Sequence, residues 1–297
     1  MKKILITGRN SYIGNSVKSW LEKVDYNVES IDVHGNDWEK MSFHNYDVVI
    51  HVAGIVHQRE TESNRHLYHE VNTVLAVKIF KKAMREGVKQ FIFFSSGAVF
   101  TQSDRKNRTI MIDEQSKCHP RTEYGKSKRN AELGMLKALR NRDEEEKDNF
   151  KLAIIRPPMV YGPGAKGNYN SLAQAAVKLP VFPYVKNQRS VLFIDNLCEC
   201  VRLIIENNDE GFFYPQDGEY ACTSDMVRLI ANSHGRKIVL IPGFGLFFSI
   251  MGRYVNMVNK VFGTYTYDKK LSEHYGGGYR VRTFKEGIGI TEKFGEN

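Results

Sequence analysis

The first half of the chain alternates short, continuous apolar runs with segments whose apolar residues recur at helical spacing. The apolar runs are residues 4–6, 28–32, 47–53, 90–96 and 151–155, and the helical patterns are residues 12–23, 63–86 and the segment after Tyr124. Runs that are apolar throughout, instead of alternating with polar residues, are typical of parallel strands covered on both faces. The pattern therefore predicts an α/β fold built on a doubly wound parallel sheet.

After about residue 165 the pattern changes, because glycine and aromatic residues become denser and the elements become shorter. Two strand-like runs and one helical run follow, at residues 191–194, 211–214 and 196–206. We expect a first domain over residues 1–165 and a smaller α/β domain over residues 166–297, the two being interleaved around residues 190–210.

Net charge restricts the kinds of partner. The 297 residues include 43 Lys and Arg against 34 Asp and Glu, a formal net charge of +9 that is spread along the chain. This balance suits an anionic small molecule or an acidic membrane surface. No basic stretch is interleaved with stacking aromatic residues, so we expect no nucleic-acid partner.

The four cysteines match neither a zinc-ligand spacing nor a disulfide framework. They are Cys118, Cys198, Cys200 and Cys222. We therefore expect no metal site and reduced thiols. The first apolar run is too short for a secretion signal, and no run reaches the roughly 18 residues of a membrane-spanning helix. These features predict a cytoplasmic protein.

A glycine-containing turn joins the first predicted strand to the first predicted helix. Gly8 suits the tight turn, and Gly14 allows the helix to pack closely on the sheet. The helix N-terminus then presents backbone N–H groups and the positive end of its dipole to a pyrophosphate. Ser11 stands where a dinucleotide fingerprint usually has its middle glycine, but a serine still allows fairly close approach. The turn therefore predicts a dinucleotide site.

Asp32 ends the second predicted strand, about 18 residues after Gly14. A carboxylate at this position can bind a ribose diol and repel a 2′-phosphate, which favours NAD over NADP. Arg9 and His34 favour the opposite choice, since either could contact a 2′-phosphate. We therefore expect NAD and leave NADP open.

Tyr124 and Lys128 are four residues apart in a segment that reads as helix, so both side chains lie on one face. A cation beside a phenol favours the phenolate, and we therefore expect the pKa of Tyr124 below its usual value of about 10. The pair predicts a proton shuttle that works near neutral pH. A surface tyrosine beside a solvated lysine is the plain alternative.

Six motifs occur along the chain in a consistent order. They are Thr7-Gly8 to Gly14, Asp32, His51 to Gly54, Ser95 to Phe100, Tyr124 with Lys128, and Arg156 to Gly164. Together they resemble the extended short-chain dehydrogenase/reductase superfamily, specifically its NAD-dependent sugar epimerase/dehydratase branch. Residues 156–168, 187–190 and 194–197 are further similar to a bacterial subgroup from surface-polysaccharide pathways.

The resemblance implies an NAD(P)-binding Rossmann domain over residues 1–165 and a substrate-binding domain over residues 166–297. It implies that Tyr124 is the catalytic acid/base, that Ser96 hydrogen-bonds the sugar hydroxyl or ketone, and that Lys128 binds the nicotinamide ribose. The further cofactor-binding residues it implies are Gly8, Ser11, Tyr12, Ile13, Gly14, Asp32, Ala53, Gly54 and Pro157.

Asn168 and Arg189 are the candidates for binding the diphosphate of a nucleotide sugar. An arginine suits phosphate because its planar fork can bind two oxygens at once. The alternative for both residues is a capping or surface role, and the sequence leaves that choice open.

The implied activity is that of an NAD-dependent 4-epimerase acting on a UDP-hexose or UDP-N-acetylhexosamine, or on a polyprenyl-diphosphate-linked sugar, in surface polysaccharide biosynthesis. The resemblance also implies a homodimer. Two alternatives stay open. One is an NAD(P)H-dependent 4-ketoreductase of a UDP-4-keto-6-deoxy sugar, which Arg9 favours. The other is a non-catalytic nucleotide-binding protein.

Residues 241–251 are unusually apolar and are followed by Arg253, Lys260 and Lys269. This combination is typical of a helix that lies in a membrane interface. We favour the alternative, in which the segment packs within the substrate domain or forms a dimer contact.

Overall fold

A computed structural model describes residues 1–56, 60–100, 109–142, 150–165, 167–244, 258 and 261–293. The chain forms two compact units. The first comprises Met1–Phe100, Cys118–Pro157 and Cys198–Tyr214, and the second comprises Thr101–Lys117, Pro158–Leu197 and Pro215–Asn297. The predicted division into a Rossmann domain over residues 1–165 and a substrate-binding domain over residues 166–297 stays a prediction.

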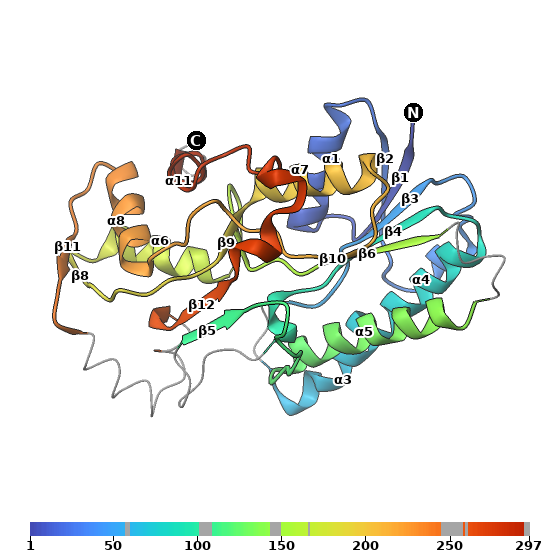
Figure 1. Cartoon of the computed structure of the whole chain (residues 1–297), viewed down its shortest axis with the longest axis horizontal. Coiled ribbons are helices and arrows are strands. Elements are labelled where there is room, and N and C mark those ends of the chain that lie inside the picture. The colour runs from blue at the N-terminus through green and yellow to red at the C-terminus, as the bar shows by residue number, and fades with distance from the viewer. Residues whose placement is uncertain are drawn as a thin grey trace. The chain divides into compact units, whose positions relative to one another are not determined.

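The first unit is built on a six-stranded sheet in which every pair of neighbouring strands is parallel. The strand order is β10-β6-β4-β3-β1-β2 (Figure 1). The strands are β1 (Lys3–Thr7), β2 (Asn27–Ile31), β3 (Val48–His51), β4 (Gln90–Phe94), β6 (Lys151–Ile155) and β10 (Gly211–Phe213). The predicted doubly wound α/β fold is therefore confirmed.

Helices cover both faces of this sheet. They are α1 (Tyr12–Glu22), α2 (Asp37–Lys40), α3 (Arg65–His69), α4 (Ala76–Arg85), α5 (Glu123–Arg140) and α7 (Ile194–Glu206). In Figure 1, α1 and α7 lie on one side of the sheet, and α4 and α5 lie on the other. Trp20 of α1 donates its indole N–H to Glu199 of α7 at 2.9 Å, which ties together the two helices of one layer.

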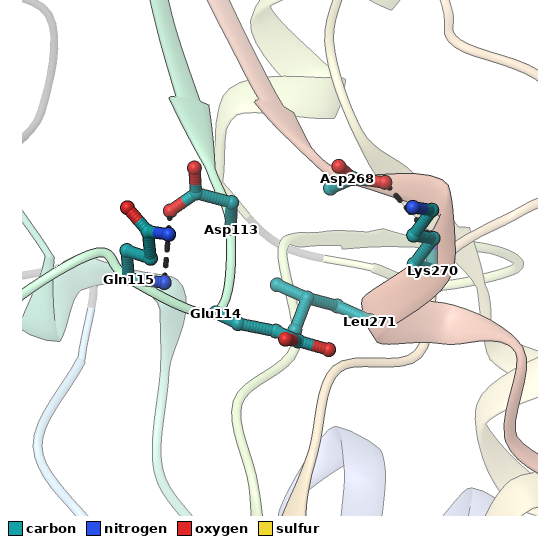
Figure 2. A pocket seen from close by; sticks show the side chains of 6 residues that line it. All are labelled: Asp113, Glu114, Gln115, Asp268, Lys270 and Leu271. Atoms are coloured by element: carbon teal, nitrogen blue, oxygen red, sulfur yellow. Dashed lines mark hydrogen bonds between the residues drawn. The ribbon is translucent and has the colours of Figure 1, made fainter.

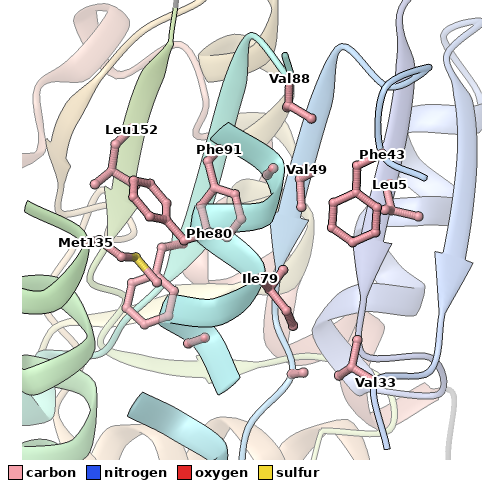
Figure 3. Close-up of a cluster of buried hydrophobic side chains, with 14 of the residues drawn as sticks. Leu5, Val33, Phe43, Val49, Ile79, Phe80, Val88, Phe91, Met135 and Leu152 are labelled. Atoms are coloured by element: carbon pink, nitrogen blue, oxygen red, sulfur yellow. The ribbon is translucent and has the colours of Figure 1, made fainter. Parts of the chain in front are cut away.

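The core between the sheet and the α4/α5 layer follows from the two-residue period of the strands. Alternate strand residues, such as Leu5, Val49 and Phe91, point into one buried cluster, which α4 and α5 complete (Figure 3). Phe80 of α4 meets Phe91 edge-on at 5.1 Å between ring centroids. The intervening residues, such as Ile4, are equally buried, as expected for strands covered on both faces.

The helix predicted over residues 63–86 is interrupted. It begins with a 3-10 turn (Glu62–Asn64) and α3, and then passes through a π-helical segment, η2 (Glu70–Leu75), before α4. A π turn inserts one residue into a helix and is frequent at functional sites. Here it carries the buried Asn72.

The strand order reverses at β1. The chain leaves β1 to form β2 on one side and returns to form β3 on the other side. In open α/β sheets, ligands bind outside the carboxyl ends of the strands at such a point. The loop after Thr7 and the loop after His51 both begin there, because Val52 and Ala53 donate their N–H groups to the carbonyl of Thr7 at 3.2 and 3.0 Å.

Among its described residues, the second unit contains three parallel two-stranded sheets and three α-helices that lie entirely within it. The sheets pair β5 (Thr109–Ile112) with β12 (Thr264–Tyr267), β7 (Met159–Tyr161) with β9 (Val191–Phe193), and β8 (Val181–Pro183) with β11 (Val239–Ile241). The helices are α6 (Asn168–Lys178), α8 (Thr223–Ser233) and α11 (Phe284–Lys293). The predicted apolar helix at 241–251 lies outside the described residues except for 241–244.

A buried aspartate holds part of the second unit together. Asp217 accepts hydrogen bonds from the backbone N–H of Phe193 (2.9 Å), from Asn196 Nδ2 (2.8 Å) and from the hydroxyl of Tyr161 (2.9 Å). Burial raises the pKa of Asp217 to about 6, although these three hydrogen bonds act in the opposite direction. Within the described part of the chain, no helix is long and apolar enough to cross a membrane.

Candidate active site

The backbone of the turn after β1 lies close to the end of β2 and to the loop after β3. Gly8 has a φ of +112°, and a Cβ there would lie 2.9 Å from the backbone nitrogen of Ala53. The N–H groups of Gly8 and Arg9 both donate to the carbonyl of Ile31, each at 3.0 Å. Only glycine suits both the positive φ and the close approach to the next loop.

Ser11 caps helix α1. Its hydroxyl accepts the N–H of Gly14 at 3.1 Å, which is the usual role of a serine at this position. This cap gives a physical reason for the serine in place of the fingerprint's middle glycine. The predicted pyrophosphate contacts Tyr12 and Ile13 are the first two residues of the helix.

Asp32 directly follows β2 and is exposed. Its carboxylate accepts the backbone N–H of His34 at 2.8 Å. Arg9 is held beside it, because its Nε and one Nη donate to the carbonyl of Ser30 at 3.2 and 3.0 Å. Asp32, predicted to bind a ribose, and Arg9, which favours NADP, therefore both lie at the end of β2.

The loop after β3 is fixed by Asn72, which sequence reasoning did not single out. Asn72 is fully buried on the π-helical segment. Its Oδ1 accepts the N–H of Ile55 at 2.7 Å, and its Nδ2 donates to the Ile55 carbonyl at 3.0 Å and to Ser127 Oγ at 3.1 Å. This clamp joins the Ala53-Gly54 loop to α5. A buried asparagine inside an apolar helical pattern is the signal that could have revealed it.

Ser96 and Tyr124 come from two segments that pack closely on each other, the loop after β4 and the first turn of α5. Ser96 leaves β4 and accepts the N–H of Ala98 at 3.1 Å, and Tyr124 lies in the first turn of α5, which Thr122 caps at 3.0 Å. Gly125 makes this approach possible, because a Cβ there would lie 2.3 Å from the carbonyl oxygen of Ala98.

Lys128 is buried one turn further along α5. Its ammonium donates to the carbonyl of Phe94 at 2.8 Å and lies 4.9 Å from the centre of the Phe93 ring. Burial lowers the pKa of Lys128 to about 8, and the charge of Glu132 acts in the opposite direction. A Cβ on Gly54 would lie 3.3 Å from the Lys128 nitrogen, so the missing side chain keeps space beside the ammonium.

The expected direction of the Tyr124 pKa was wrong. Burial raises the pKa of Tyr124, the hydrogen bond with Ser96 lowers it, and the charge of Tyr68 raises it. Lys128 is not among these causes, because its ammonium is directed to the end of β4. Helical spacing placed the two residues on one face but could not show where the ammonium points.

A buried ion pair lies behind these residues. Arg156 donates to both carboxylate oxygens of Glu132, which in turn accepts the Ser95 hydroxyl at 2.5 Å. Ser95 precedes Ser96, Glu132 follows Lys128 by one helical turn, and Arg156 precedes Pro157.

Pro157 is buried at the end of β6. Its carbonyl accepts the N–H of Gly97 at 2.9 Å, so the loop after β4 and the loop after β6 are joined directly. The ion pair and this hydrogen bond together fix the strand ends from which Ser96 and Pro157 project.

Asn168 and Arg189 both lie in the second unit. Asn168 is the exposed first residue of α6. Arg189 exchanges two backbone hydrogen bonds of 2.9 Å with Ala221, and its guanidinium donates to the Gly263 carbonyl at 3.2 Å. Burial lowers the pKa of Arg189. Their predicted contact with a substrate diphosphate stays a prediction.

A pocket of about 210 Å³ in the second unit involves none of the predicted site residues. Its lining residues are Asp113, Glu114, Gln115, Asp268, Lys270 and Leu271 (Figure 2). Two of its carboxylates close local turns, since Asp113 accepts the N–H of Gln115 and Asp268 accepts the N–H of Lys270. We interpret this pocket as a surface feature of the turns.

The residues of the first unit fit a dinucleotide. Lys128 is a buried cation whose ammonium has three N–H groups, and the Phe94 carbonyl takes one of them, which leaves donors for a ribose diol. Asp32 offers an exposed carboxylate for a second diol, and the Ser11-capped helix offers its positive end to phosphates between them.

The fold and these residues define an NAD-binding α/β enzyme. Residues 4–214 match the model of the NAD dependent epimerase/dehydratase family, and the chain belongs to this family. It is thus an NAD(P)-dependent enzyme of the sugar epimerase and reductase type, and the non-catalytic alternative is set aside.

Relatives of known activity agree with this assignment. The chain is 29% identical over 315 residues to a UDP-glucose 4-epimerase of Vibrio cholerae, covering 97% of this chain and 93% of that protein. It is 26% identical to N-acetyl-alpha-D-glucosaminyl-diphospho-ditrans,octacis-undecaprenol 4-epimerase of Escherichia coli O157:H7, covering 70% of this chain and 65% of that protein.

A solved structure supports the fold over its whole length. The UDP-glucuronic acid 4-epimerase from Bacillus cereus in complex with NAD superposes with a TM-score of 0.73 at 16% identity, covering 98% of each chain. At this identity the likeness shows the fold.

Proposed function

We propose that this protein is an NAD-dependent 4-epimerase of a nucleotide sugar, a UDP-hexose or a UDP-N-acetylhexosamine, in surface polysaccharide biosynthesis. Support comes from family membership over residues 4–214 and from the similarity to a UDP-glucose 4-epimerase across 97% of the chain. The similarity to a polyprenol-linked epimerase extends the candidate substrates to a lipid-linked N-acetylhexosamine.

The observation that carries the proposal is the close packing of the start of α5 on the loop after β4, where a Cβ on Gly125 would lie 2.3 Å from the Ala98 carbonyl oxygen. This packing supports an arrangement in which the hydroxyl groups of Ser96 and Tyr124 both contact one oxygen of a sugar. Tyr124 takes the proton of the sugar 4-hydroxyl and later returns it, while Ser96 orients that oxygen. Because burial holds Tyr124 as the neutral phenol in the chain alone, we expect its deprotonation in the complex with cofactor and sugar.

The other proposed residues bind and orient. Lys128 binds the ribose next to the reacting centre, and Asp32 binds the ribose at the far end of the dinucleotide. Gly8 and the capped start of α1 lie along the pyrophosphate. When bound, NAD would supply reversible hydride transfer at the sugar C4.

Incubation of the purified protein with UDP-glucose and, separately, UDP-N-acetylglucosamine tests the proposal. We expect NMR spectra to show conversion to the galacto epimer of at least one of them, without added reduced cofactor. Tyr124→Phe should lower turnover by at least about 100-fold, the usual scale of a lost acid/base group, and leave bound NAD nearly unchanged. A Tyr124→Phe variant that retains more than a few per cent of the wild-type rate contradicts the proton-shuttle role.

A 4-ketoreductase of a UDP-4-keto-6-deoxy sugar is the second candidate. Arg9 favours it, because its guanidinium lies at the end of β2, where a 2′-phosphate of NADP would need a cation. Analysis of the cofactor that copurifies separates the two. Retained NAD⁺ supports the epimerase, whereas a protein that turns over only with added NADH or NADPH supports the reductase. The homodimer remains a prediction.

A further inference from the structure

The small sheet formed by β8 and β11 has an apolar outer face. The register pairs Val239 with Val181 and Ile241 with Pro183, so these four side chains share one side of the sheet. Val239 is 61% exposed, Val181 is 45% exposed and Ile241 is 39% exposed. Phe182, between them in the strand, points the other way and is buried.

Neighbouring positions extend this face along the chain. Leu179 and Tyr184 flank β8, Phe244 follows β11, and all three are exposed. We use the name β8–β11 face for the set Leu179, Val181, Pro183, Tyr184, Val239, Ile241 and Phe244. Apart from the Tyr184 hydroxyl, its side chains carry no hydrogen-bonding group. Contiguous exposed apolar surface of this kind marks an interaction site more often than an ordinary solvated surface.

Basic residues flank the two segments of the β8–β11 face along the chain. Lys178, Lys186, Arg236 and Lys237 are exposed and lie within three residues of it along the chain. Within the described part of the chain, none of these four forms an ion pair. The sequence contains no aspartate or glutamate between residues 170 and 194 or between residues 226 and 244. Basic residues therefore flank the apolar face along the chain, and no acidic residue lies in the same two segments.

We propose that the β8–β11 face docks on an anionic lipid bilayer. An apolar surface rimmed by lysine and arginine matches the acyl boundary and the charged headgroups of such a membrane, and each cation near an anionic surface strengthens binding by roughly fivefold. Tyr184 lies at the edge of the face, and tyrosine is enriched at the depth of the lipid headgroups. The face has almost no directional hydrogen-bonding side chains, which disfavours a specific acidic protein as the occupant.

Flotation with vesicles tests this inference on the full-length protein. We expect the protein to float with vesicles of phosphatidylglycerol and phosphatidylcholine, and to do so about tenfold less with phosphatidylcholine alone or in high salt. Val239→Glu and Lys237→Glu should each lower the bound fraction several-fold. Met111→Glu is the control for Val239→Glu, because Met111 is another exposed strand residue of the same unit. Lys285→Glu is the control for Lys237→Glu, because it makes the same charge change at an exposed residue away from the face. Both controls should bind like wild type.

Several results would overturn the inference. These are absence of flotation with the anionic vesicles, or equal loss of binding in the controls and in the two face variants. A wild-type dimer that Val239→Glu converts to a monomer in light scattering would assign the face to a second copy of the chain instead. Turnover of a soluble UDP-sugar without vesicles should be unchanged in Val239→Glu, so failure of the proposed activity and failure of membrane docking are separate results.

Discussion

Arg156 donates from Nε and Nη2 to the two carboxylate oxygens of Glu132, at 2.9 and 2.7 Å, and both side chains are buried. The pair joins the end of β6 to the middle of α5, and the Ser95 hydroxyl joins the end of β4 to the same carboxylate. All three segments continue directly into residues of the candidate site. We therefore expect the geometry of that site to depend on this buried charge pair.

Replacing Glu132 with glutamine should destabilise the protein by about 3–5 kcal/mol, because it leaves the Arg156 cation buried without a counter-charge. Chemical denaturation measures this change. Glu123→Gln is the control on the same helix, since Glu123 forms an exposed pair with Lys126 and should contribute less than about 1 kcal/mol. Equal losses in the free energy of unfolding for the two variants would contradict a larger contribution from the buried pair.

The lowered pKa of Lys128, about 8 against an ordinary 10.5, predicts a pH dependence of cofactor binding. A deprotonated amine attracts the electron-rich oxygens of a ribose less, so affinity for NAD should fall as pH rises from 7 to 9.5. Calorimetric titration at several pH values measures this change. Lys128→Met should bind weakly with little pH dependence, whereas the exposed Lys126→Met should follow wild type. A wild-type affinity that stays constant up to pH 9.5 would contradict the role.

The same shift has a consequence for stability without cofactor. Between pH 8 and 10.5 the unfolded chain binds more protons at Lys128 than the folded chain, so stability rises with pH in this window. At pH 7 the buried charge costs up to about 3 kcal/mol. Lys128→Met should therefore be more stable than wild type at pH 7 while losing activity.

Gly125 is expected to tolerate no side chain. A Cβ at this position meets the Ala98 carbonyl at 2.3 Å, and that oxygen is backbone that cannot rotate away. Gly125→Ala should cost about 1–3 kcal/mol through overpacking and should lower turnover, because it moves Tyr124 away from Ser96. Gly289→Ala in α11 is the control, since a Cβ there meets nothing within 4 Å and alanine favours a helix. Wild-type turnover in Gly125→Ala would contradict the argument.

Asp217 should make the protein less stable as pH rises from about 4 to 6. Its folded pKa of about 6 exceeds the ordinary 3.8, so the folded chain binds more protons in this window and the stabilisation is lost above it. Asp217→Asn keeps an acceptor for Phe193 and Asn196 and should remove the slope, with a gain of up to about 3 kcal/mol at pH 8. Asp225→Asn, on the surface, should keep the wild-type slope, and an unchanged slope in Asp217→Asn would refute the assignment.

Local patterns predicted the parallel sheet because buried parallel strands are apolar throughout, and they predicted the turn at Gly8 because a tight turn needs a positive φ. Helical spacing predicted that Tyr124 and Lys128 share one face, and the family resemblance added Ser96, although the roles of all three still need the tests above.

The remaining features depend on contacts between distant residues, which a periodic pattern does not encode. Asn72 reaches Ile55 and Ser127, and Glu132 reaches Ser95 and Arg156. The direction of the Tyr124 pKa was wrong for the same reason, since it depends on burial and on where an ammonium four residues away is held.

The late position of β10 in the sequence also affects how the sheet forms during synthesis. β10, the last strand of the six-stranded sheet, ends at residue 213 of 297, so β6 has an open hydrogen-bonding edge until most of the chain has been translated. Open strand edges promote aggregation. We therefore expect nascent chains that stop before residue 211 to need chaperones during synthesis, and fragments that end there to be recovered as insoluble protein.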